Sequence, residues 1–165
     1  IKVMPYPCDG GANFEIESFV KDADENFTVL YSILDADGKE VASACRPADS
    51  TKVSAFVPDT TNWDIDNPYL YTVTAKLQRR NETFDEVTVK TGVRSFSCDS
   101  NKGFIINGVE TPLRGVSRHQ DMLYKGNALT REDHYEDARI IKDLGANTIR
   151  LAINTVKISM MLVMN

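Results

Sequence analysis

The sequence predicts a mainly β protein in which an immunoglobulin-like β-sandwich is followed by a single β-α-β unit. Between Asn13 and Phe96, apolar and polar residues alternate in short runs separated by turn residues, as in antiparallel strands. About seven short strands in about a hundred residues fit an immunoglobulin-like sandwich. After Thr130 the apolar residues recur every three or four positions, which is typical of a helix.

The strands of the sandwich are read from this alternation. Residues 1–7 form a strand or a linker, and six further strands are expected near residues 14–19, 27–34, 41–45, 52–57, 69–77 and 84–89. The Asp-Ala-Asp-Gly run at 35–38 closes one hairpin, and the adjacent basic pair at 79–80 fits the tip of another. Pro58 and Pro68 mark strand boundaries because proline has no N–H to donate.

Trp63, Tyr69 and Tyr71 allow two interpretations. Aromatic faces can stack on sugar rings, but alternation along a strand favours packing in the core of the sandwich. We therefore assign the sandwich no chemistry and expect it to support the part that follows.

A further hairpin is predicted from residues 104–106 and 111–116, turned at Asn107-Gly108, because this dipeptide tolerates positive φ at both positions. Its second strand runs into the polar residues Arg118, His119, Gln120 and Asp121. In α/β barrels, the groups that touch substrate follow the strands at this point. This strand end is the candidate site.

A helix should follow the loop after this strand. Thr130 is its N-cap with Asp133 three residues later, and Gly145 ends it at the C′ position. Glu132 and Glu136 are expected on its solvated face. Its half-buried stripe should consist of Tyr135, Ala138, Ile141 and Leu144.

The apolar segment at residues 147–152 completes the β-α-β unit. Because crossovers between parallel strands are right-handed and short, the strands before and after the helix should be parallel neighbours. This arrangement is the first repeat of a (β/α)8 barrel.

Composition excludes some classes of function. The 165 residues are 42% hydrophobic and 26% charged with a formal net charge of -5, which argues against a nucleic-acid partner. No run approaches the roughly 18 apolar residues of a membrane span, and the first residues lack the pattern of a signal peptide. Cys8, Cys45 and Cys98 have no metal-ligand spacing and are expected to be buried or unreactive thiols.

Longer motifs resemble glycoside hydrolase family 2, the family of the β-galactosidases. Residues 103–120, GFIINGVETPLRGVSRHQ, resemble that family's junction between an immunoglobulin-like domain and a catalytic barrel. The GVRSF run at 92–96, the W-x-x-x-N-P-x-L-Y pattern at 63–71 and NTIRLA at 147–152 extend the resemblance. It covers residues 27–152, most of the chain.

The resemblance implies a domain organisation and an activity. Residues 1–100 would form the sandwich domain, 101–152 the first repeat of the barrel, and 153–165 a tail outside the family pattern. Family 2 implies retaining hydrolysis of carbohydrate substrates, here galactosides, by two carboxylates and without cofactor or metal. Both catalytic glutamates of the family belong to later barrel strands, so no catalytic residue is assigned and this chain alone should be inactive.

The resemblance implies three substrate-binding residues: Arg118, His119 and Arg150. His119 matches a histidine that contacts the sugar, and Arg150 matches an arginine beside the nucleophilic carboxylate. Arg118 could instead tie the loop by pairing with Asp121. Asp121 and Asn127 could face the sugar, whereas the second histidine, His134, is expected on the surface of the helix.

Two further expectations concern assembly and function. A lone β-α-β unit exposes apolar residues such as Ile149 and Leu151, which predicts a homo-oligomer, a dimer formed through residues beyond Thr130. The alternative to a glycosidase is a stand-alone immunoglobulin-like module that binds carbohydrate or protein without catalysis. The sequence predicts no membrane association and no particular compartment.

Residues 153–165, INTVKISMMLVMN, abandon the family pattern. Back-translated and read one base earlier, they can encode Q-H-S-Q-D-F-Y-D-A-C-D-E, which resembles what family 2 places there. We hypothesise that a small deletion near the codon of Ala152 shifted the reading frame. The alternative is a genuine variant in which residues 158–164 form their own edge strand.

Overall fold

The computed structural model describes residues 1–21, 24, 26–50 and 52–151. The hypothesis about residues 153–165 therefore lies outside the described residues. The chain divides into two compact units: residues 1–97 with 106–108, and residues 98–105 with those from Val109 onward.

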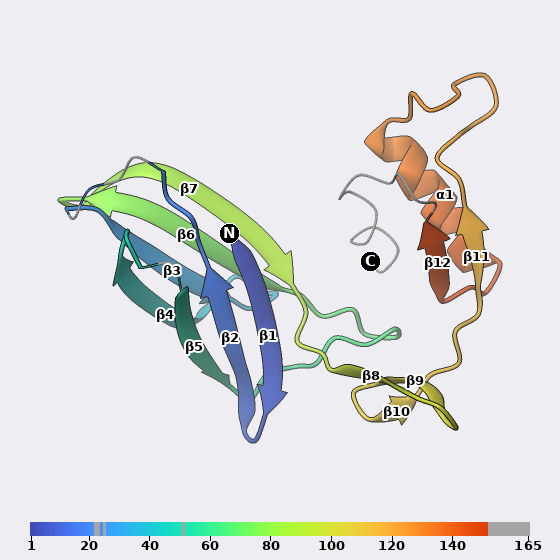
Figure 1. Ribbon diagram of the computed structural model, residues 1–165, viewed down its shortest axis with the longest axis horizontal. Helices are drawn as coiled ribbons and strands as arrows, with labels where there is room; N and C mark the ends of the chain where they lie inside the picture. The colour runs from blue at the N-terminus through green and yellow to red at the C-terminus, as the bar shows by residue number, and fades with distance from the viewer. Residues whose placement is uncertain (22–23, 25, 51, 152–165) are drawn as a thin grey trace. The chain divides into compact units, whose positions relative to one another are not determined.

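The first unit is an antiparallel sandwich of two sheets, drawn in blue to green in Figure 1. One sheet has the strand order β1-β2-β5 and the other β4-β3-β6-β7. Residues 1–7, for which a strand or a linker was expected, contribute an edge strand that pairs with β2 along its whole length. The strands are β1 (Lys2–Cys8), β2 (Gly11–Glu17), β3 (Thr28–Leu34), β4 (Glu40–Pro47), β5 (Lys52–Pro58), β6 (Tyr71–Arg79) and β7 (Glu82–Thr91).

The core of the sandwich lies between the two sheets and is built from every second residue of the strands. On β2 and β5 the exposed and buried positions alternate strictly, as the period of two requires. Burial of a side chain such as Phe14 stabilises the fold by about 1.5–3 kcal/mol. The buried hydroxyl of Tyr31 is satisfied by a hydrogen bond to Ser18.

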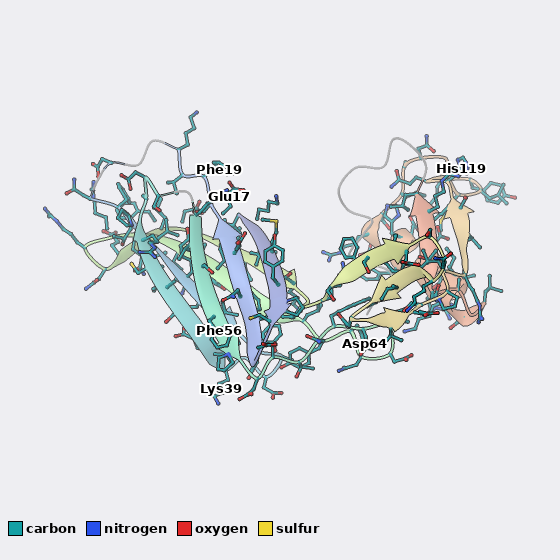
Figure 2. All side chains as sticks on the ribbon, turned by 60° about the horizontal axis from the view of Figure 1, so that its bottom comes forward. Glu17, Phe19, Lys39, Phe56, Asp64 and His119 are labelled. Atoms are coloured by element: carbon teal, nitrogen blue, oxygen red, sulfur yellow. The ribbon has the colours of Figure 1, made fainter. Side chains whose placement is uncertain are left out.

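Trp63 and Tyr71 are each 3% exposed, which favours their role in packing over sugar stacking. The ring of Tyr69 packs edge-on against Tyr71, and its hydroxyl accepts a hydrogen bond from the N–H of Ala36. The turn at 35–38 is present, with Gly38 at a φ of 82°. Figure 2 shows Lys39, next to this turn, at the opposite end of the sandwich from Glu17 and Phe19.

The cysteines were expected to be buried or unreactive, and burial is wrong, because Cys8, Cys45 and Cys98 are all exposed and free. That they are unreactive stays a prediction. Cys8 ends an edge strand, and Cys45 lies at an outward position of β4. Alternation places such positions on the outer face of a sheet, whatever the hydrophobicity of the side chain.

A smaller sheet follows, formed by β8 (Phe96–Asp99), β9 (Gly103–Ile106) and β10 (Val109–Glu110) in the order β10-β9-β8. The predicted turn is confirmed, since Asn107 and Gly108 have φ values of 49° and 81°. The predicted second strand at 111–116 is wrong: β10 ends at Glu110, and the next strand begins only at Gly115. Pro112, which cannot donate to a ladder, lies in the interval.

The β-α-β unit consists of β11 (Gly115–Arg118), α1 (Arg131–Asp143) and β12 (Thr148–Leu151), and the two strands are parallel neighbours as predicted (Figure 1). The side chain of Asn147 fastens the start of both strands. Its Oδ1 accepts from the N–H of Arg114 at 2.8 Å, and its Nδ2 donates to the carbonyl of Pro112 at 2.9 Å. No closed barrel is present among the described residues.

Both ends of α1 lie where the sequence predicts them. Thr130 and Asp133 form a reciprocal capping box, and Gly145 has the positive φ of a C′ residue. The predicted apolar stripe is only partly buried: Ala138 and Ile141 are buried, whereas Leu144 is 75% exposed. Leu144 is the C-cap, where the chain already leaves the helix.

Candidate functional site

The candidate site is the carboxyl end of β11, where the polar residues predicted from the sequence begin. His119 directly follows the last residue of β11, is exposed, and is labelled in Figure 2. Gln120 is half-buried and Asp121 is exposed in the loop that leads to α1. This loop follows the carboxyl end of a parallel strand, the position of substrate-contacting groups in α/β barrels.

Arg118 points to the helix. Its Nε donates to Oδ2 of Asp137 at 2.7 Å, and one of its terminal nitrogens pairs with the same oxygen. The sequence suggested Asp121 as a partner for Arg118, but the carboxylate that binds Arg118 is that of Asp137. The Arg118 side chain is 9% exposed and that of Asp137 is 24% exposed, so this pair is shielded from water better than an ordinary surface ion pair.

His134 also contacts Arg118, and its predicted place on the surface is therefore wrong. Its Nδ1 lies 3.1 Å from Nη2 of Arg118, and the residue is half-buried. A guanidinium has only donors, so Nδ1 of His134 must be the acceptor and the ring proton must be on Nε2. His134 and Asp137 are three residues apart, which places both on one helix face.

Arg150 lies on the other face of the strand pair. In the register of β11 and β12, Arg150 is opposite Ser117, and Arg118 is opposite Leu151. Successive side chains of a strand point to opposite faces, so Arg118 and Arg150 point in opposite directions. Because Arg118 points to α1, the exposed side chain of Arg150 is on the face away from the helix.

The end of the loop is anchored near the helix N-terminus. Lys125 Nζ donates to Oδ1 of Asp133 at 2.6 Å, and the N–H of Thr130 donates to Oδ2 of the same carboxylate at 2.9 Å. The bond from Lys125, followed by that from Thr130, lowers the pKa of Asp133 from its ordinary value to about 2. Lys125 lies within a tight turn between Met122 and Gly126, in which Tyr124 has a φ of 68°.

The structure therefore separates the three predicted site residues. Arg118 is bound to the helix, whereas His119 and Arg150 are exposed. Asp137, His134 and Lys125 are partners that the sequence analysis did not predict, although the spacing of His134 and Asp137 on one helix face is a usable signal. Among the described residues, no group of three or more His, Cys, Asp or Glu side chains could hold a metal ion.

Comparison with family models decides the family. Residues 5–94 match the model of the glycosyl hydrolases family 2, and residues 99–155 match the TIM barrel domain of the same family. The chain belongs to glycoside hydrolase family 2. The fold agrees, since the described residues form a sandwich and the start of an α/β barrel.

The curated relatives are β-galactosidases and β-glucuronidases. The β-galactosidase BoGH2A of Bacteroides ovatus is 39% identical over 140 residues, which are 81% of this chain and 16% of that protein. A putative β-glucuronidase of Formosa agariphila is 32% identical over 130 residues, 77% of this chain and 16% of that protein. The chain thus spans about a sixth of the length of these relatives.

Solved structures show the same relationship. The crystal structure of an FMN-binding β-glucuronidase from Facaelibacterium prausnitzii L2-6 matches with a TM-score of 0.91 and 61% identity. The matched region covers 95% of this chain and 25% of that protein. A putative β-galactosidase from Bacteroides fragilis matches with a TM-score of 0.84 and 26% identity, over 94% of this chain and 25% of that protein. No helix in the described part of the chain is long and apolar enough to cross a membrane.

Proposed function

We propose that this chain supplies the sandwich domain and the first β-α-β repeat of a retaining β-glycosidase whose activity requires further barrel strands. The match of residues 99–155 to the family's TIM barrel domain carries this proposal. In this reaction one carboxylic acid protonates the leaving oxygen, and a second carboxylate about 5 Å away attacks the anomeric carbon. Both groups would come from later strands, and the tail at 153–165 is the product of a shifted reading frame.

His119 and Arg150 are the substrate-side residues of this proposal. His119 follows the carboxyl end of β11, where its imidazole can donate a hydrogen bond to a sugar hydroxyl. Arg150 is on the sheet face away from α1, which would be the interior of the barrel. A guanidinium beside the nucleophilic carboxylate would keep that carboxylate ionised. Arg118 acts from the opposite face and supports the site rather than touching substrate.

The substrate class has two candidates, both from relatives. The sequence resemblance favours a β-galactoside, in agreement with the 39% identical BoGH2A. The 61% identical structure is that of a β-glucuronidase, which favours a β-glucuronide. A β-glucuronide carries a carboxylate that a β-galactoside lacks, and this carboxylate requires a cationic partner in the site.

The experiment uses the longer protein that is made when the reading frame is restored near the codon of Ala152 and the remaining barrel strands are translated. It is assayed on the 4-nitrophenyl β-D-galactoside and β-D-glucuronide, and hydrolysis of either with retention supports the proposal. His119→Ala and Arg150→Met should each lower kcat/KM by about a hundredfold, the scale of a lost transition-state contact. The matched control is Arg139→Met, since Arg139 pairs with Glu136 and Asp143 on the exposed helix surface. Equal activity in all three variants contradicts the assignment.

The alternative, a stand-alone binding module, is tested with the 165-residue chain. Saturable binding of a β-galactoside or β-glucuronide by this chain would favour the module. The proposed dimer is tested separately by light scattering of the same chain, and a monomer at high concentration contradicts it. Its surface would include Tyr135, Ile140 and Leu144, which are 44%, 45% and 75% exposed.

A further inference from the structure

The part of the loop that carries His119 is fastened to α1 on both sides. On one side Arg118, the last residue of β11, is held by Asp137 and His134 in the first two turns of the helix. On the other side Lys125, in the middle of the loop, is held by Asp133 on the first turn. The loop segment between these anchors is only six residues long, from His119 to Tyr124. Its conformation is therefore constrained from both sides.

The anchor at Arg118 has a specific geometry. The Arg118 side chain is nine-tenths buried, and its guanidinium donates to two different side chains of one helix face. A planar fork can do this, whereas a lysine ammonium of shorter reach and no planar geometry cannot reproduce it. Since the backbone of Arg118 is covalently continuous with His119, fixing the Arg118 side chain also fixes where the His119 backbone leaves the sheet.

We propose that the first two turns of α1 are a template for the substrate-site loop, in which Asp137 and His134 position Arg118, Asp133 positions Lys125, and His119 is thereby presented to substrate. These are positioning residues, because their contacts are on the helix face of the strand pair and Arg150 is on the other face. That His119 faces substrate rests on the proposed function, but the template itself does not.

The tautomer of His134 tests the template directly. The contact with Arg118 requires the Nε2–H tautomer, since Nδ1 must accept. The chain has two histidines, so the imidazole nitrogens can be assigned by NMR with a single variant, His134→Gln. The expected result is a ring of His134 held as Nε2–H in the wild-type chain and a mixture of tautomers in Arg118→Met. A wild-type His134 in the Nδ1–H tautomer overturns the proposal, whatever the variants do.

Amide hydrogen exchange measures the effect on the loop. Asp137→Asn keeps an oxygen that can accept from Arg118 but removes the carboxylate charge, so it should speed exchange at residues 118–120 by about tenfold, the scale of the difference between a charged and a neutral hydrogen bond. The matched control is Asp143→Asn, which removes the same charge from the same helix, where Asp143 pairs only with the exposed Arg139 among the described residues. His134→Gln retains a carbonyl acceptor and should keep nearly wild-type exchange, whereas His134→Met should not. Equal exchange in Asp137→Asn and Asp143→Asn contradicts the template.

Kinetics of the longer protein connect the template to the reaction. Asp137→Asn should lower kcat by about tenfold with little change in KM, because a displaced His119 loses alignment in the transition state. Asp143→Asn should leave both constants unchanged. Full activity of Asp137→Asn overturns the positioning role. If the wild-type protein hydrolyses no glycoside, the proposed function fails, while the NMR and exchange results still decide the template.

Discussion

The side-chain amide of Asn107 donates a hydrogen bond to the carbonyl of Trp63 at 2.9 Å, across 44 residues of sequence. The same side chain accepts from the N–H of Ser95 at 2.9 Å through its Oδ1. Asn107 also has a φ of 49°, the left-handed region that asparagine tolerates better than most residues. One residue thus makes the turn between β9 and β10 and fastens this turn to the segment around Trp63.

Replacement of Asn107 should separate these two roles. Asn107→Gly keeps the left-handed turn and loses both side-chain hydrogen bonds, so it should lower the free energy of unfolding by about 1–3 kcal/mol. Asn107→Ala should cost about 1 kcal/mol more, because alanine is strained at this φ. Urea unfolding of the chain measures both. Asn101→Ala, in another exposed turn, is the control. Equal stability of Asn107→Gly and the wild type would contradict a stabilising role of the two Asn107 side-chain hydrogen bonds.

Gly115 should tolerate no side chain, because a Cβ there would lie 2.1 Å from the carbonyl oxygen of Thr148 and 2.4 Å from its Cγ2. Gly115→Ala therefore forces β11 and β12 apart, and we expect a loss of about 1–3 kcal/mol in the free energy of unfolding. Thr148→Ala should not rescue it, since the shorter contact is with the backbone. Recovery of wild-type stability in the double variant Gly115→Ala/Thr148→Ala would show that the side chain of Thr148, and not its carbonyl oxygen, excludes a Cβ at position 115.

Acid should loosen the start of α1. The folded pKa of Asp133, about 2, is lower than its ordinary value, so its contribution to stability is present above pH 4 and is lost as the pH falls through about 2. NMR titration of the carboxyl carbon should show this low midpoint. Amide protection at the first turn should fall over the same range, and Lys125→Met should raise the midpoint toward 4. A midpoint near 4 in the wild type refutes the Lys125 contact.

The 165-residue chain by itself should hydrolyse no glycoside. Both carboxylates of the retaining mechanism are expected on barrel strands beyond β12, and their loss removes the covalent route. The assay is prolonged incubation with chromogenic galactoside and glucuronide at high protein concentration. Turnover that is abolished by replacing one residue of this chain, such as Glu110 or Glu136, would show that an acid or nucleophile lies among these residues.

The sequence alone determined the features that depend on near neighbours in the chain. Strand alternation depends on which residues can be buried at every second position, and it placed the strands of the sandwich. The Asn107-Gly108 turn and the Thr130–Asp133 capping box each lie within four consecutive residues. Family membership followed from motifs that likewise occur in short runs. Each of these features has a local physical cause, so local sequence was sufficient.

Only the tertiary structure decided which residues meet and which face they share. Arg118 and Arg150 both occupy strand ends in family motifs, but the register of β11 against β12 sends their side chains to opposite faces. The sequence offered Asp121 as the partner of Arg118, and the crossover that lays α1 on the strand pair supplies Asp137 and His134 instead. Such contacts join residues 16 and 19 positions apart, and their energy depends on the burial and orientation that packing imposes.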